Sequence, residues 1–309
     1  MRIRHLRLGI LILLLASQST MAGPLLDRLI ERRQQRQGAE AMSGPRSKID
    51  IPKQSISYGS DANQTFDVYA PKQTTGAPAI FMVHGGGWKR GDKNAAGVVD
   101  NKVKRWVNQG IVFISVNYRM LPDADPYVQA EDIARALAKA QQDAARWGAD
   151  RNRFVLMGHS AGAHLVSLLA ASPGLLQKFG ASAPIGTVSL DSATLDVVQT
   201  MEGKHFRLHD DAFGTNHAFW EKVSPWHAMS SRPAPILAVC STRRADACPQ
   251  AVRFTDKAKS FGGVGIVLRQ DMTHGEINAK LGDDETYTQN VENFLSDLDP
   301  ELAQRLSRK

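Results

Sequence analysis

Ser160 lies within the sequence Gly-His-Ser-Ala-Gly of residues 158–162, between an apolar run at 154–157 and a stretch with helical spacing. A serine at the tip of a tight strand-to-helix turn lies in strained backbone, where only residues without a Cβ fit on either side. The N-terminal end of the following helix and the free N–H of Ala161 would then face the hydroxyl. This spacing predicts a nucleophile beside a site that stabilises negative charge.

A second motif, His-Gly-Gly-Gly-Trp at residues 84–88, follows the apolar run 79–83. Three successive glycines add no side chain to a core and raise the entropy cost of folding, so their use is close approach of the backbone. We expect the N–H groups of Gly86 and Gly87, with that of Ala161, to point toward an oxyanion. The alternative is a plain flexible loop.

The segments around these motifs alternate between short apolar runs and helical patterns. This rhythm predicts an α/β protein with a mostly parallel sheet and helices on both faces. Strands are expected at 54–58, 66–69, 79–83, 111–116, 154–157, 185–190, 235–240 and 265–268, and helices at 102–110, 130–147 and 284–298.

Together the motifs resemble the α/β-hydrolase superfamily, and within it the hormone-sensitive-lipase-like and bacterial kynurenine-formamidase or feruloyl-esterase-like branches. The motifs at 84–88, 117–119 and 158–162 stand in the expected order, and the similarity covers roughly residues 50–298. Asn117 and His159 stand where the lipase-like branch usually has Asp. Both departures favour the formamidase-like side and leave the substrate open.

The resemblance implies a triad in the chain order Ser, Asp, His. His274, in the loop Met272–Asn278, is the expected general base. Asp246, in the loop 241–249 after a buried strand, is the expected acid, with Asp196 as its substitute. The alternatives are a structural histidine and a solvated loop aspartate. Residues expected to support the site are His84, Gly85, Trp88 and His159.

Two further segments bear on the site. Residues 202–229 interrupt the regular rhythm with several aromatic and histidine side chains, which predicts either a small cap lining the pocket or a satellite core under a loop. A zinc site from these histidines has irregular spacing and little support. The only two cysteines, Cys240 and Cys248, bracket the loop of Asp246. A disulfide there would hold that aspartate still.

The first 22 residues carry three arginines followed by a short apolar run, the pattern of a secretory signal peptide. An uncleaved anchor is the alternative. Removal of the signal peptide would lower the formal net charge of +7 by three, which weakens any argument for nucleic-acid binding. A basic arm at 23–48 and a hydrolase domain at 49–309 would follow. We expect an exported protein, periplasmic or secreted, without stable membrane insertion after cleavage.

These observations predict a serine hydrolase that acts on small-molecule carboxylic esters without a metal or organic cofactor. An arylformamidase or another amidase could use the same machinery. A hydrolase-like binding protein without catalysis is the alternative from another class.

Overall fold

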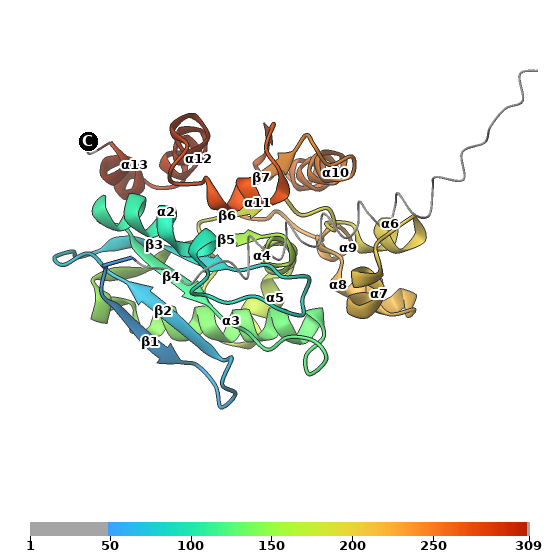
Figure 1. Ribbon diagram of the computed structural model, residues 1–309, viewed down its shortest axis with the longest axis horizontal. Helices are drawn as coiled ribbons and strands as arrows, with labels where there is room; N and C mark the ends of the chain where they lie inside the picture. The colour runs from blue at the N-terminus through green and yellow to red at the C-terminus, as the bar shows by residue number, and fades with distance from the viewer. Residues whose placement is uncertain (1–48, 308–309) are drawn as a thin grey trace, which may run out of the picture.

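One eight-stranded sheet, in the order β1-β2-β4-β3-β5-β6-β7-β8, organises the molecule (Figure 1). The computed structural model describes residues 49–307, so the predicted signal peptide (1–22) and the predicted arm (23–48) lie outside the described residues. The pairs β1–β2 and β2–β4 are antiparallel, and all other neighbours are parallel. The strands are β1 (Lys53–Ser57), β2 (Thr65–Tyr69), β3 (Ala77–Val83), β4 (Val112–Val116), β5 (Ala149–His159), β6 (Gly186–Leu190), β7 (Ile236–Ser241) and β8 (Gly265–Gln270).

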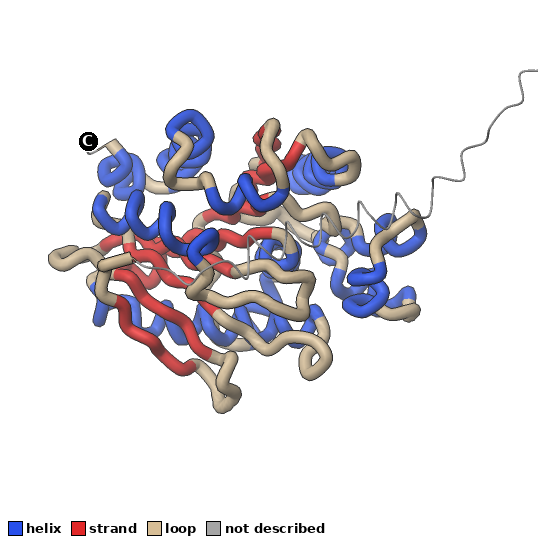
Figure 2. Tube along the Cα trace, in the orientation of Figure 1, coloured by secondary structure: helices blue, strands red, loops and turns tan. Residues whose placement is uncertain are grey.

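Helices cover both faces of this sheet, as the tube in Figure 2 shows. On one face pack α3 (Pro126–Asp143), α4 (Ala161–Ala171) and α5 (Pro173–Lys178). On the other pack α2 (Ala96–Asn108), α11 (His274–Ala279), α12 (Glu285–Leu298) and α13 (Pro300–Leu306). A short 3-10 helix (Ala144–Trp147) precedes β5, and α10 (Ala247–Ser260) packs beside β7. The predicted α/β class is confirmed.

The central strands are buried on both faces, and this is why their sequences are continuous apolar runs. Successive side chains of a strand point to opposite faces. In β3, Phe81 and Val83 belong to the core beneath α3 and α4, whereas Ile80 and Met82 belong to the core beneath α2 and α12. One strand thus supplies both hydrophobic cores.

Some helix boundaries differ from the predicted ones. Helix α2 begins at Ala96 rather than at residue 102, because Val98 and Val99 extend its buried face. Residues 274–279 form the short helix α11 where a loop was expected, and Thr273 and Glu276 close it with a reciprocal capping box. His274 is therefore the first residue of a capped helix.

The segment 197–228 folds as four short helices at one end of the molecule (Figure 1). Its aromatic side chains Phe213, Phe219 and Trp220 pack against the core that contains Trp88. This cap therefore extends the core, as one of the two predictions had it, and it also covers the loop of residues 84–88. The cap helices are α6 (Val197–Glu202), α7 (Arg207–Phe213), α8 (His217–Val223) and α9 (Pro225–Ala228).

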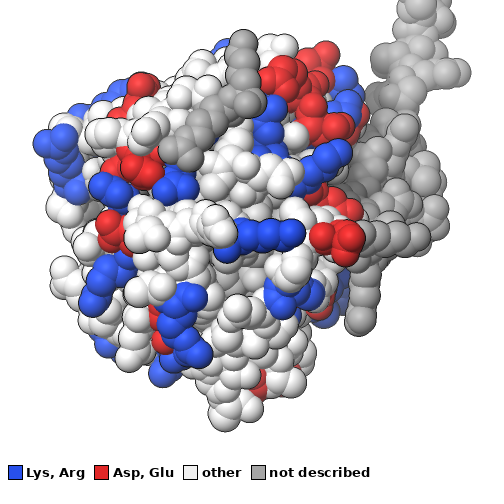
Figure 3. Space-filling view, turned by 90° about the vertical axis from the view of Figure 1, so that its left-hand side faces the viewer, with Lys and Arg blue, Asp and Glu red and all other residues white. Residues whose placement is uncertain are grey.

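None of the helices within residues 49–307 is long and apolar enough to cross a membrane. On the face shown in Figure 3, basic and acidic side chains of the described residues are interspersed. A nucleic-acid surface needs a field of one sign, so this face offers no support for one.

Lys102 of α2 is an unusual core residue, because only 1% of it is exposed. Its ammonium group donates hydrogen bonds to the carbonyls of Gly97 and of Asn278, the latter in α11. Burial lowers the pKa of Lys102 from its ordinary value of 10.5 to about 7. The unfolded chain therefore holds this proton more tightly than the folded one, and stability falls as the pH drops from about 10.5 toward 7.

Replacing Lys102 by methionine should stabilise the protein more at pH 6 than at pH 9, by roughly 2 to 3 kcal/mol from the pKa difference. The lost hydrogen bond to Asn278 costs about the same at both pH values, so the difference isolates the charge. Urea unfolding of wild type and Lys102→Met at the two pH values measures it. Lys104→Met, at an exposed position of the same helix, is the control and should show little pH dependence. An equal effect of Lys102→Met at both pH values would contradict the prediction.

Candidate active site

The parallel strands bring their carboxyl ends to one edge of the sheet, where the polar motifs lie. His84 directly follows β3, Ser160 directly follows β5, and Asp191 directly follows β6. His274 opens α11, a few residues after β8. Strand order therefore places side chains that are distant in sequence within contact distance of one another.

Ser160 has the strained backbone that its neighbours predict. Its φ of 58° and ψ of −120° lie outside the regions that ordinary residues adopt. A Cβ on Gly158 would stand 2.4 Å from the carbonyl oxygen of Gly162, and one on Gly162 would stand 2.3 Å from that of Val83. The turn therefore requires glycine at both positions, and the N–H of Ser160 is held by the carbonyl of Leu190 at 3.0 Å.

A continuous line of hydrogen bonds runs through Ser160, His274 and Asp191. The Ser160 Oγ lies 2.9 Å from His274 Nε2, and His274 Nδ1 lies 2.6 Å from Asp191 Oδ2. Asp191 is fully buried, and its other oxygen accepts the N–H of Ser241 at 2.8 Å. The carboxylate is fixed from both sides, and the imidazole lies between an acid and a hydroxyl.

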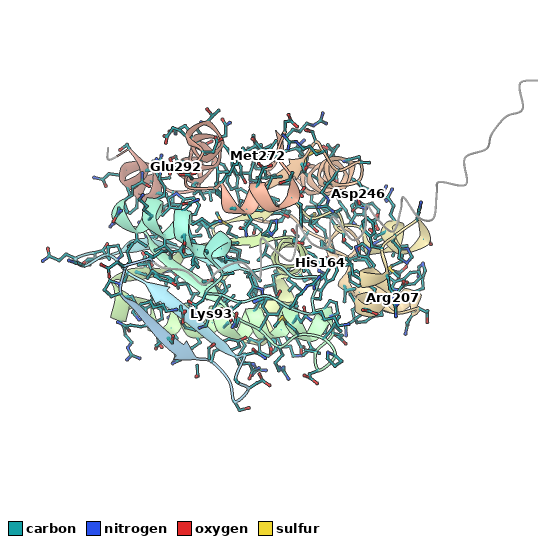
Figure 4. The ribbon with its side chains drawn as sticks, in the orientation of Figure 1. Lys93, His164, Arg207, Asp246, Met272 and Glu292 are labelled. Carbon is teal, nitrogen blue, oxygen red and sulfur yellow. A yellow bond between two sulfur atoms is a disulfide. The ribbon has the colours of Figure 1, made fainter. Side chains whose placement is uncertain are left out.

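The structure corrects the prediction for the acid. Asp246 does not contact His274; it stands at the N-terminal end of α10 (Figure 4), where its side chain is 54% exposed and 3.9 Å from Arg244. Asp191 occupies the expected position instead. The loop after β7 directs the Arg244 side chain, not a carboxylate, toward the imidazole.

Asp196, the substitute considered for the acid, also lies elsewhere. It caps α6 by accepting the N–H of Gln199 and pairs with Arg253 at 2.9 Å. His227 lies 3.5 Å from its other side. These contacts tie the base of the cap to α10 and give Asp196 a structural role.

One signal in the sequence could have identified Asp191. It is a carboxylate directly after a buried strand, the same place that His84 and Ser160 hold after theirs. In an α/β sheet the carboxyl ends of the strands are where functional side chains gather. Its φ of 55° turns the backbone at that point, which could not be read from the sequence.

The charges around the imidazole oppose one another. Burial raises the pKa of Asp191, but Arg244 and the hydrogen bond to His274 outweigh it and hold that pKa well below its usual range. Burial and then Arg244 lower the pKa of His274, against the raising effect of Asp191. At neutral pH the pair is thus a carboxylate beside a neutral imidazole, the form that a general base requires.

The glycine loop has the backbone that its sequence predicts. Gly86 and Gly87 have φ values of 126° and 59°, and a Cβ on Gly86 would lie 1.6 Å from the carbonyl oxygen of Arg90. Leu208 of α7 would be 3.9 Å from a Cβ on Gly87. The cap therefore lies directly over the loop that was expected to bind an oxyanion.

Trp88 and His164 connect this loop to α4 and to the cap. The Trp88 indole N–H donates to His164 Nδ1 at 3.2 Å, and His164 Nε2 lies 2.8 Å from the carbonyl oxygen of Val223. Burial lowers the pKa of His164 to about 4, so it is neutral and can accept from one side while donating to the other. Phe213 packs on the edge of Trp88 at 4.9 Å between ring centres.

His84, Gly85 and His159 support the site from beneath. The His84 ring stacks on Tyr118 at 4.6 Å, and its Nδ1 donates to the Gly85 carbonyl at 2.7 Å. His159 is buried, and its Nε2 donates to the backbone carbonyl of His274 at 2.9 Å. It thus holds the backbone of the predicted base from below.

Two other predictions concern this end of the molecule. Cys240 and Cys248 form a disulfide, as predicted, and it closes the loop that carries Arg244 and Asp246. The cap histidines do not converge: within residues 49–307 no group of three or more His, Cys, Asp or Glu side chains could hold a metal ion.

Comparison with known proteins finds relatives that match part of this chain and a solved structure that shares its fold. The chain is 30% identical to esterase LipC of Mycobacterium tuberculosis over 157 residues, which cover 50% of this chain and 37% of that protein. It is 27% identical to kynurenine formamidase of Salmo salar over 118 residues, 38% of each chain. The chain therefore spans less than two thirds of the length of these two relatives.

A solved structure of Thermogutta terrifontis esterase 2, phosphonylated by sarin, superimposes with a TM-score of 0.68 at 19% identity, covering 82% of this chain and 98% of that one. A likeness at this identity shows the fold alone, and that fold is the α/β-hydrolase fold. The BD-FAE family matches residues 66–243, more than half of the chain. With its eight-stranded, mostly parallel sheet and its serine turn after β5, this chain belongs to the BD-FAE family of α/β hydrolases.

Proposed function

We propose that the protein is a serine hydrolase that cleaves carboxylic esters through an acyl-enzyme intermediate. The line of hydrogen bonds from Asp191 through His274 to Ser160 carries this proposal. The likeness to an esterase in sequence supports the reaction type.

In the first half-reaction Ser160 Oγ attacks the ester carbonyl while His274 Nε2 takes its proton. Asp191 keeps the proton of His274 on Nδ1 and stabilises the imidazolium that forms. The N–H groups of Gly86, Gly87 and Ala161 would receive the oxyanion of the tetrahedral intermediate. Collapse of that intermediate breaks the ester C–O bond, and His274 returns the proton to the leaving alcohol.

In the second half-reaction water takes the place of the alcohol. His274 removes a proton from the water, the hydroxyl attacks the acyl-Ser160 carbonyl, and the acid leaves as Ser160 recovers its proton. Side chains and backbone of this chain perform each step, so the proposal requires no cofactor. The same N–H groups would stabilise both tetrahedral intermediates.

We also propose that the protein is exported to the periplasm or secreted. The charged and apolar pattern of residues 1–22 supports export. The disulfide between Cys240 and Cys248 suits an oxidising compartment.

A second candidate is hydrolysis of an aryl formamide. The partial likeness to kynurenine formamidase favours it, as do the departures at Asn117 and His159. The proposed machinery is the same, because attack on a formyl carbonyl also passes through an oxyanion. Only the preferred substrate separates the two.

Ser160→Ala should abolish hydrolysis of p-nitrophenyl acetate and p-nitrophenyl butyrate, because it removes the hydroxyl that is proposed as the nucleophile. A time course beside N-formylkynurenine identifies the preferred substrate. Ser260→Ala, at the exposed end of α10, is the matched control and should keep wild-type rates. If wild type and Ser160→Ala are equally inert on all three compounds, a binding function gains support over catalysis.

Asp191→Asn should lower kcat on the order of 10³- to 10⁴-fold, because an amide no longer holds the imidazole in the required tautomer. Asp246→Asn should leave kcat at pH 8 within a few-fold of wild type, because this side chain is exposed and does not contact His274. Steady-state kinetics of both variants with the better ester measure the contrast. A large loss in Asp246→Asn with little loss in Asp191→Asn would place the acid where the sequence first suggested it.

A further inference from the structure

Arg244 is a charged side chain that contacts both Asp191 and His274, yet the proposed reaction does not use it. Its Nη1 donates to Asp191 Oδ2 at 2.9 Å and to the Asp191 backbone carbonyl at 3.1 Å. The same nitrogen lies 3.0 Å from His274 Nδ1. One guanidinium nitrogen therefore contacts both members of the pair.

The position of one proton follows from these distances. At 2.6 Å, Nδ1 of His274 and the Asp191 carboxylate must share a hydrogen, and a carboxylate has none to give. Nδ1 therefore carries the proton. Arg244 cannot donate to the same nitrogen, so its hydrogen bonds go to Asp191, and its charge lies beside the imidazole without a bond to it.

The side chain of Arg244 is held in place, with only 18% of it exposed. A buried cation is costly unless it is paired, and the fully buried Asp191 carboxylate is its close partner. The adjacent Arg243 pairs instead with the exposed Asp271 at 2.8 Å and lies 3.6 Å from Glu276, without contact to Asp191. The two arginines of this loop thus have different surroundings, and one serves as a control for the other.

The loop that carries Arg244 is anchored at both ends. The disulfide between Cys240 and Cys248 closes it. Ser241 donates its N–H to Asp191 Oδ1 and its hydroxyl to the carbonyl of Met272, at 2.8 and 2.6 Å. The loop, the acid and the segment before His274 are therefore one connected unit.

Resting on the proposed hydrolase function, we propose that Arg244 is a positioning residue, which fixes the Asp191 carboxylate toward His274 and sets the acidic limit of the activity. It does so in two ways. Its hydrogen bonds orient the carboxylate, and its charge opposes a second proton on the imidazole.

The sign of the pH effect follows from the groups that face His274. Asp191 at the end of β6 and Asp246 at the start of α10 favour the protonated imidazole, whereas burial and Arg244 disfavour it. The buried His159, beneath the ring, is itself kept neutral, since burial and then His274 lower its pKa. Removing the Arg244 charge should therefore raise the pKa of His274. The imidazole would then become protonated, and cease to act as a base, at a higher pH.

The test is the pH profile of kcat/KM for p-nitrophenyl acetate in Arg244→Gln. The acidic limb of this profile, where activity is lost as His274 becomes protonated, should move to a pH about one unit higher than in wild type. At a pH well below the limbs of wild type and variant, this shift is a tenfold loss of kcat/KM. Arg244→Lys keeps the charge and should restore the limb, with a lower kcat because an ammonium on a flexible stem holds the carboxylate less firmly than the planar guanidinium does. Arg243→Gln should leave the limb in place.

Asp246→Lys is a second variant. Its position is exposed, so the substitution should not impair folding. It adds a cation beside Arg244 and should move the acidic limb to lower pH. A limb that stays in place in Arg244→Gln, or one that does not move down in Asp246→Lys, overturns the proposal. A loss in Arg244→Gln that is equal at every pH also overturns it, because a merely structural role predicts that result.

The two proposals fail in different ways. If wild type shows no hydrolysis that depends on Ser160, the proposed function fails. If hydrolysis depends on Ser160 but the acidic limb does not shift in Arg244→Gln, only the present inference fails.

Discussion

The hydrogen bond between His274 and Asp191 depends on nearly every other feature of the fold. It joins residues 83 positions apart, one after β6 and one after β8. Parallel pairing of β6 with β7 and of β7 with β8 aligns the carboxyl ends of these strands. The contact at 2.6 Å then requires the capped start of α11 on one side and the N–H of Ser241 on the other. A shift of register in any of these strands would separate the two side chains.

Strain and burial have complementary roles at this edge. Ser160 is held in backbone that costs free energy, of order 1 to 3 kcal/mol at such positions, and the surrounding packing must outweigh it. The compensation is local. Neutral His164 ties Trp88 of the glycine loop to Val223 of the cap, and the helix that carries it packs in the core. Ser160, the proposed nucleophile, and the predicted oxyanion site therefore share one support.

The sequence was most informative where one residue type had one use. Apolar runs predicted the sheet, and the glycines at 158 and 162 predicted the turn, because no other residue fits beside the carbonyls that they face. The acid was harder to predict. Asp191, Asp196 and Asp246 all lie near strand ends at the same edge; the place directly after a strand favours Asp191, but the sequence does not show which side chain points inward. That choice depends on backbone direction, such as the φ of 55° at Asp191. The contacts of Arg244 depend on the same geometry, so its role could not be predicted either.

The location of the acid also explains the charge that accompanies it. A carboxylate on an exposed loop after β7 would keep much of its hydration, as Asp246 does. Asp191, fully buried at the end of β6, loses that hydration and needs other partners to remain ionised. The loop after β7 supplies these partners as the N–H of Ser241 and the guanidinium of Arg244. Because the buried carboxylate of Asp191 needs a positive partner, the neighbouring loop can carry Arg244 at this edge of the sheet. The charge of Arg244 in turn lowers the pKa of His274 and so opposes its protonation.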